Sequence, residues 1–100
     1  MVIKVTDYIK QCYSNSDGQI IRNLISTVFS DGQKVKVSFE NVDSVTSSFV
    51  NTAFIALLDS FTYDFIRSCM SFSNSTKQIN KMIKDRFEFE VSERKELVAR

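Results

Sequence analysis

Three consecutive hydroxyl residues are the side chains in this sequence best placed for chemistry. Thr46, Ser47 and Ser48 follow the alternating segment 34–39 and directly precede a long apolar segment that starts at Phe49. A hydroxyl at a helix start can accept a hydrogen bond from an amide of the first turn, which stabilises the helix by about 1 kcal/mol. A serine there can also carry a phosphate, because the free amides and the dipole of the helix favour an anion. The residues alone leave both roles open.

Other kinds of site are disfavoured by the composition. The sequence has no His, and Cys12 and Cys69 lie far apart, so we expect no metal site. The acidic residues are scattered, without the spacing of a paired general acid and base. Gly18 and Gly32 are the only glycines, which excludes a glycine-rich phosphate loop. We therefore expect a protein that is not an enzyme and that uses no cofactor.

Length and charge indicate one globular domain with a protein partner. A chain of 100 residues predicts a single domain over 1–100, since one core of this size buries about two thirds of the unfolded surface. Apolar residues make up 43% of the chain, and the formal net charge is only +1.

One helical face is basic, but such a face is more often solvated than bound to phosphates. We do not expect nucleic acid as the partner. That face carries Lys77, Lys81, Lys84 and Arg86.

The sequence shows no signal for export or for a membrane. The segment MVIKVTDYIK at residues 1–10 has no apolar run of the length that a signal peptide needs. A run of about 18 apolar residues, which a spanning helix requires, occurs nowhere in the chain. Two isolated cysteines are consistent with a reducing compartment. We expect a cytoplasmic protein that does not bind membranes.

The elements that would position the hydroxyls alternate between strands and helices. β-branched residues predict a short strand over 2–6, and strict alternation predicts a strand over 34–39 that is covered on one face. Helical periodicity predicts a helix from residue 16 or 17 to the Asp31-Gly32 stop. The widest apolar helical surface predicts a central helix from about 48 to 61.

The second half of the chain continues this alternation. A mixed apolar run predicts a strand over 65–72, and Asn74 or Ser75 could cap the basic helix that follows. Alternating residues predict another short strand over 87–91, before a charged tail over 92–100. The order predicts an α/β fold with a small mixed or mostly parallel sheet and helices packed mainly on one face. The weak first strand could instead pair antiparallel at an edge.

Two segments resemble a family of short bacterial STAS-like proteins. They are DGQIIRNLI at residues 17–25 and KVKVSFENVDSVTSSFVNTAFIALL at residues 34–58. In these proteins a strand that ends in an aromatic residue, an N-V-x-x-V connection, a Ser-Ser-Phe turn and a helix follow one another. The resemblance extends over roughly residues 3–80 and implies a STAS-like fold.

The resemblance also implies a function for the turn formed by Thr46, Ser47 and Ser48, here called the hydroxyl turn. In the wider STAS class, which includes anti-sigma factor antagonists, the turn carries Asp-Ser-Ser-Gly, and a serine accepts phosphate from a partner kinase. By this likeness Ser47 and Ser48 are phospho-acceptor candidates, Thr46 replaces the Asp, and Phe49 replaces the Gly. The implied partner-binding residues are these four and Asn51. The implied partner is a protein of the histidine-kinase ATPase type or a sensor.

Two classes of function follow from the sequence. The first is a non-enzymatic regulatory module that docks a partner at the Ser-Ser turn and is switched by phosphate. The second is a structural adaptor or homo-oligomer, in which an exposed sheet edge or the segment 87–91 pairs with another chain.

Overall fold

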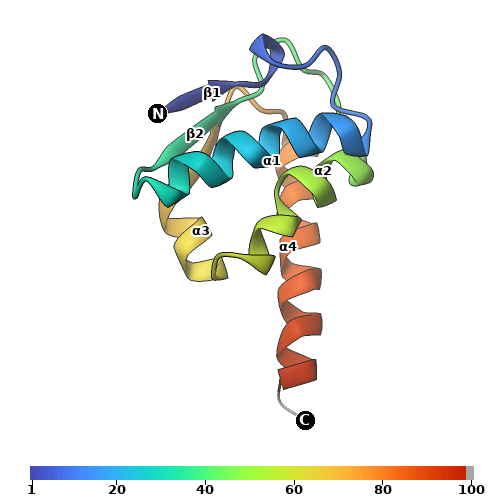
Figure 1. Cartoon of the computed structure of the whole chain (residues 1–100). Coiled ribbons are helices and arrows are strands. Elements are labelled where there is room, and N and C mark those ends of the chain that lie inside the picture. The colour runs from blue at the N-terminus through green and yellow to red at the C-terminus, as the bar shows by residue number, and fades with distance from the viewer. Residues whose placement is uncertain (99–100) are drawn as a thin grey trace.

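A computed structural model describes residues 1–98 of the chain as a small α/β domain (Figure 1). It contains a three-stranded sheet and four α-helices, so the predicted α/β class is confirmed. Two 3-10 turns, labelled η1 and η2, complete the elements. In chain order these are β1 (Val2–Lys4), η1 (Val5–Asp7), α1 (Asn15–Ser30), β2 (Val35–Ser38), α2 (Ser47–Ala53), η2 (Ile55–Asp59), α3 (Tyr63–Cys69), β3 (Met70–Ser73) and α4 (Lys77–Val98).

The sheet is entirely parallel, with β2 between β1 and β3. The alternative of an antiparallel first strand is therefore wrong. Register places Ile3 beside Val37 and Val37 beside Phe72, which forms one apolar row. The next row contains Lys36 and Ser71, which are both exposed. The sheet thus has a solvated face near β2, as the alternating sequence predicts.

Helix α1 agrees with the helix that the periodicity predicts. Its N-cap is Ser14, whose Oγ accepts a hydrogen bond from the Asp17 amide at 3.1 Å. Its buried side includes Ile21 and Ile25, one turn apart. The chain leaves the helix through Gly32, whose φ of 74° lies in the left-handed region that glycine adopts without strain.

The predicted continuous helix over 48–61 is broken into α2 and η2. Its second part is the 3-10 turn η2, and Phe54 joins the two parts with φ −120° and ψ −49°. Phe54, Ile55 and Leu57 are all buried, yet on one straight helix Ile55 and Leu57, which are two residues apart, would lie on nearly opposite sides. The change of direction allows all three side chains to enter the core.

The predicted strand over 65–72 is wrong for most of its length. Residues up to Cys69 belong to α3, and the strand β3 begins only at Met70. The N-cap of α3 is Thr62, whose Oγ1 accepts a hydrogen bond from the Phe65 amide at 3.1 Å. An apolar run of this length fits either period, and here the threonine cap determines which one forms.

The predicted strand over 87–91 is also wrong, because these residues lie within α4. Ile79, Ile83 and Phe87 recur every four residues and are all buried, whereas Phe89 is 55% exposed. The helical period therefore determines the structure of this segment. The predicted cap at Asn74 or Ser75 is replaced by Thr76, whose Oγ1 accepts a hydrogen bond from the Ile79 amide at 3.1 Å. Of the predicted charged tail, residues 92–98 are helical and residues 99–100 lie outside the described residues.

The far part of α4 extends past the rest of the fold in Figure 1. It is attached to η2 through Arg94, which donates to the Leu58 carbonyl at 3.3 Å and to the Asp59 carboxylate at 2.9 Å. Within residues 1–98 no single helix is both long and apolar enough to cross a membrane. Only the pair formed by 47–59 and 63–69, which is bent by 117°, passes that test when counted together.

Candidate functional site

Thr46 is the residue that caps α2. It has extended backbone angles, and its Oγ1 accepts a hydrogen bond from the Phe49 amide at 3.2 Å. The same hydroxyl donates to the Tyr13 carbonyl at 2.8 Å, and the Thr46 amide donates to the Cys12 carbonyl at 3.1 Å. Helix capping is therefore confirmed for Thr46. The residue also joins the start of α2 to the segment that precedes α1.

Ser47 and Ser48 are the first two residues of α2, and both are exposed. Among residues 1–98, neither serine hydroxyl makes a hydrogen bond with another protein group. Because Thr46 already supplies the cap, both hydroxyls are available to groups that approach from solvent. The resemblance predicted these two serines as phosphate acceptors, and the fold leaves both exposed at the start of α2.

The other two predicted contact residues are less accessible than the two serines. Phe49 is fully buried, with its ring centroid 6.0 Å from that of Phe54, so its predicted role in partner contact is wrong. Its ring belongs to the inward side of α2 together with Val50 and Ala53. Asn51 is half-buried, and its Oδ1 accepts a hydrogen bond from Arg86 Nε at 2.9 Å, which ties α2 to α4. The exposed part of the predicted surface is thus Ser47 and Ser48.

Gly18 allows α1 to pack closely against α2, the helix that carries this surface. The sequence-based prediction missed this residue. A Cβ atom at Gly18 would lie 2.8 Å from the Thr52 Cβ, 3.0 Å from the Phe49 carbonyl oxygen and 3.1 Å from the Ala53 amide nitrogen. Helices α1 and α2 therefore touch through their backbones at this point. A hydrogen bond of 3.0 Å from Thr52 Oγ1 to Asn15 Oδ1 reinforces the crossing. The available signal was a glycine within an otherwise regular helical pattern.

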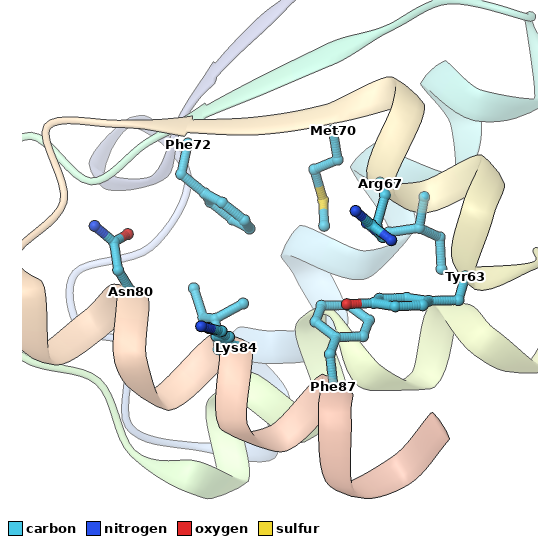
Figure 2. A pocket seen from close by; sticks show the side chains of 9 residues that line it. Tyr63, Arg67, Met70, Phe72, Asn80, Lys84 and Phe87 are labelled. Atoms are coloured by element: carbon cyan, nitrogen blue, oxygen red, sulfur yellow. The ribbon is translucent and has the colours of Figure 1, made fainter. Parts of the chain in front are cut away.

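A second candidate site lies between α3, β3 and α4, where a pocket of about 400 Å³ opens (Figure 2). Its lining combines apolar side chains with the cations Arg67 and Lys84. The sequence-based prediction missed it because it assigned 65–72 and 87–91 to strands. The available signal was a pair of stripes at the helical spacing i, i+3, i+4, i+7. These stripes are Tyr63, Ile66, Arg67, Met70 and Asn80, Ile83, Lys84, Phe87.

The structure combines a small parallel β-sheet with a turn of hydroxyl residues between its central strand and the next helix, which agrees with the STAS-like fold that the resemblance implies. Over residues 17–80 the chain matches the family described as "STAS-like domain of unknown function (DUF4325)". The match covers more than half of the chain, so the protein belongs to this family, and the resemblance seen in the sequence is confirmed. Comparisons with curated proteins and with solved structures gave no match.

Proposed function

We propose that this STAS-like domain is a regulatory protein-interaction module that binds its partner on the surface formed by Ser47 and Ser48. The supporting observation is that Thr46 alone caps α2, while both serine hydroxyls are exposed. A requirement for helix capping therefore accounts for one hydroxyl of the three and leaves two without a structural role. With seven residues, α2 supplies only a short dipole, so the exposure of the hydroxyls is the stronger argument.

In this proposal one of the two serines accepts a phosphate from a kinase partner. Phosphorylation adds about 1.5 to 2 negative charges and three strong hydrogen-bond acceptors. The turn beneath is fixed by the bonds of Thr46 to Tyr13 and of Asn51 to Arg86, and by the close contact at Gly18. The phosphate would therefore change the charge of a rigid surface. It would repel an acidic partner or recruit one that presents arginine.

The family resemblance suggests a histidine-kinase-type ATPase or a sensor as the partner. The adaptor alternative has less support from the fold. One of its two proposed contacts, strand pairing at 87–91, is lost because these residues are helical. The other contact is a sheet edge, but β1 has three residues and β3 has four. Short edge strands offer few backbone groups to another chain.

Two measurements test the proposal. Phosphopeptide mapping by mass spectrometry of the protein purified from its native cell should find phosphate on Ser47 or Ser48. Binding of the co-purified partner should then be compared for Ser47→Ala, Ser47→Asp, Ser48→Ala and Ser48→Asp. The matched controls are Ser71→Ala and Ser71→Asp, because Ser71 is also an exposed serine but lies on β3.

We expect at least one substitution at each position to change partner binding, while the Ser71 variants bind as wild type. Circular dichroism should show that every variant keeps its helices. If all four variants fold and bind like wild type, and no phosphate is found, the regulatory proposal is wrong and the adaptor becomes the better explanation.

A further inference from the structure

The pocket between α3, β3 and α4 has the size and the composition of a small-molecule site. Its volume of about 400 Å³ lies within the range of roughly 300 to 1,000 Å³ that is typical of ligand sites. Ile66, Ile83 and Phe87 form a buried base, while Met70 and Phe72 are only half-buried. The pocket is therefore apolar, and part of its wall remains without a packing partner.

Aromatic rings dominate this wall. The rings of Tyr63 and Phe87 lie 5.5 Å apart between centroids, tilted by 30°. The Phe72 ring is held from behind by stacking on Phe39 at 5.9 Å, and Figure 2 shows it pointing into the pocket from β3. The thioether of Met70 lies in the same wall, and sulfur makes favourable contacts with aromatic rings. Such a lining suits a flat aromatic group.

Both charged groups that line the pocket are positive, and the neutral polar groups of Tyr63 and Asn80 lie beside them. The charged groups are Arg67 on α3 and Lys84 on α4, and each is the third residue of its stripe of lining residues. Among the described residues, neither cation takes part in an ion pair, and no carboxylate lines the pocket. An anion could therefore approach both charges without displacing a protein carboxylate.

Arg67 is held in place by the ring beside it. Its guanidinium carbon lies 5.5 Å from the centroid of the Tyr63 ring, at the distance of a cation–π contact. A guanidinium beside an aromatic ring can still donate its N–H groups to an acceptor. In Figure 2 Arg67 and Tyr63 extend from α3 toward the pocket, opposite Lys84 on α4. The fork of N–H donors on an arginine matches the two oxygens of a carboxylate.

We propose that this pocket binds a small aromatic carboxylate. The aromatic ring lies against Phe72, Phe87 and Met70, and the carboxylate binds Arg67 and Lys84. The apolar wall and the two free cations together specify both parts of such a molecule. A neutral analogue loses the attraction to the cations, and an aliphatic acid without a ring loses most of the apolar contact.

Titration with 1-naphthylacetate, followed by calorimetry and by amide chemical shifts in NMR, tests this site. The probe is compared with 1-naphthylacetamide, which has the same ring and no charge, and with acetate, which has the charge and no ring. We expect one bound naphthylacetate per chain, with the largest shifts around Phe72, Phe87 and Arg67. We expect the amide to bind about fivefold more weakly, since an exposed charge pair contributes up to about 1 kcal/mol.

Arg67→Gln and Lys84→Gln should each weaken naphthylacetate binding by about two- to fivefold. Arg67→Lys should retain more affinity than Arg67→Gln. Lys77→Gln is the matched control, because Lys77 is exposed on α4 like Lys84 but does not line the pocket. Thermal melts confirm that each variant is folded. The proposal is overturned by equal binding of acid and amide, by wild-type affinity in both Gln variants, by shifts centred elsewhere, or by no binding at millimolar probe.

Discussion

Two helix pairs in the described part of the chain differ in how closely their backbones approach. Helices α1 and α2 meet at Gly18, where even one added Cβ would come within 2.8 Å of Thr52. On the other side, α3 and α4 are separated by large side chains such as Tyr63 and Phe87, and a pocket of about 400 Å³ remains between them. A glycine at one contact and aromatic residues at the other thus produce a closed side and an open side.

The difference in helix packing also determines which chemical groups the closed side and the open side expose. Close packing of α1 on α2 buries Phe49, whereas Ser47 and Ser48 stay exposed at the start of α2. In the proposed function a phosphate would change the charge of that surface, and a protein partner would respond to the change. The open side exposes apolar wall and two cations within a concave space, which suits a small amphiphilic anion.

Adding volume to the closed side should produce the largest effect. We expect Gly18→Leu to lower the free energy of unfolding by about 3 kcal/mol, because the new side chain meets backbone atoms of Phe49 and Ala53. Urea unfolding followed by circular dichroism measures this loss. Gly32→Ala is the control, since nothing lies within 4 Å of a Cβ there and only its φ of +74° opposes the change. That variant should lose about 1 kcal/mol. Equal losses would show that the helices can separate at Gly18.

Removing one hydroxyl from each side should produce the next largest effect. Thr46→Ala loses the cap of α2 and also the hydrogen bond to Tyr13, whereas Thr62→Ala loses only the cap of α3. We expect losses of about 2 kcal/mol and about 1 kcal/mol respectively. Urea unfolding of the two variants gives the difference directly. A larger loss for Thr62→Ala would contradict the view that the closed side is held more firmly.

The sequence predicted the closed side better than the open side. Helix α1, strand β2 and the capping hydroxyl each carry a local signal, namely a regular period or a cap beside it. The segment 87–91 carries two periods at once, and only burial of Ile79, Ile83 and Phe87 in one core selects the helix. A local pattern cannot show that selection.

The sites show the same division. The exposed serines could be predicted, because a strand end followed by a helix start places them on a turn. The burial of Phe49 could not be predicted from the resemblance, which aligned it with a small residue. The pocket depends on how the stripe that starts at Tyr63 faces the stripe that starts at Asn80, and this arrangement is set by the tertiary fold.

Adding volume to the open side should be tolerated. We expect Met70→Phe to change the free energy of unfolding by less than about 1 kcal/mol, because the larger ring can extend into the pocket. The same substitution should weaken naphthylacetate binding, since it fills the space for the probe. Thermal melts and the titration described above measure the two effects. A loss as large as that of Gly18→Leu would mean that the two sides are equally closed.

The smallest expected effect is a difference in reactivity between the two native thiols, Cys12 and Cys69. Burial, with a smaller contribution from the charge of Asp17, raises the pKa of the Cys12 thiol to about 12, and this residue is 1% exposed. Cys12 lies on the closed side, where its carbonyl accepts from Thr46, whereas Cys69 is half-buried at the end of α3. Thiolate is the nucleophile, and a raised pKa keeps the proton on the sulfur.

We therefore expect iodoacetamide at pH 8 to add one group to the folded protein, on Cys69, and two groups in urea. Intact mass and peptide mapping identify the sites. Between pH 7 and pH 9 the folded Cys12 should stay unlabelled, because this range lies well below its pKa of about 12. A Cys69→Ser variant should take no label while folded. Rapid labelling of Cys12 in that variant would show that the segment beside Thr46 opens readily, and the distinction between a closed and an open side would then fail.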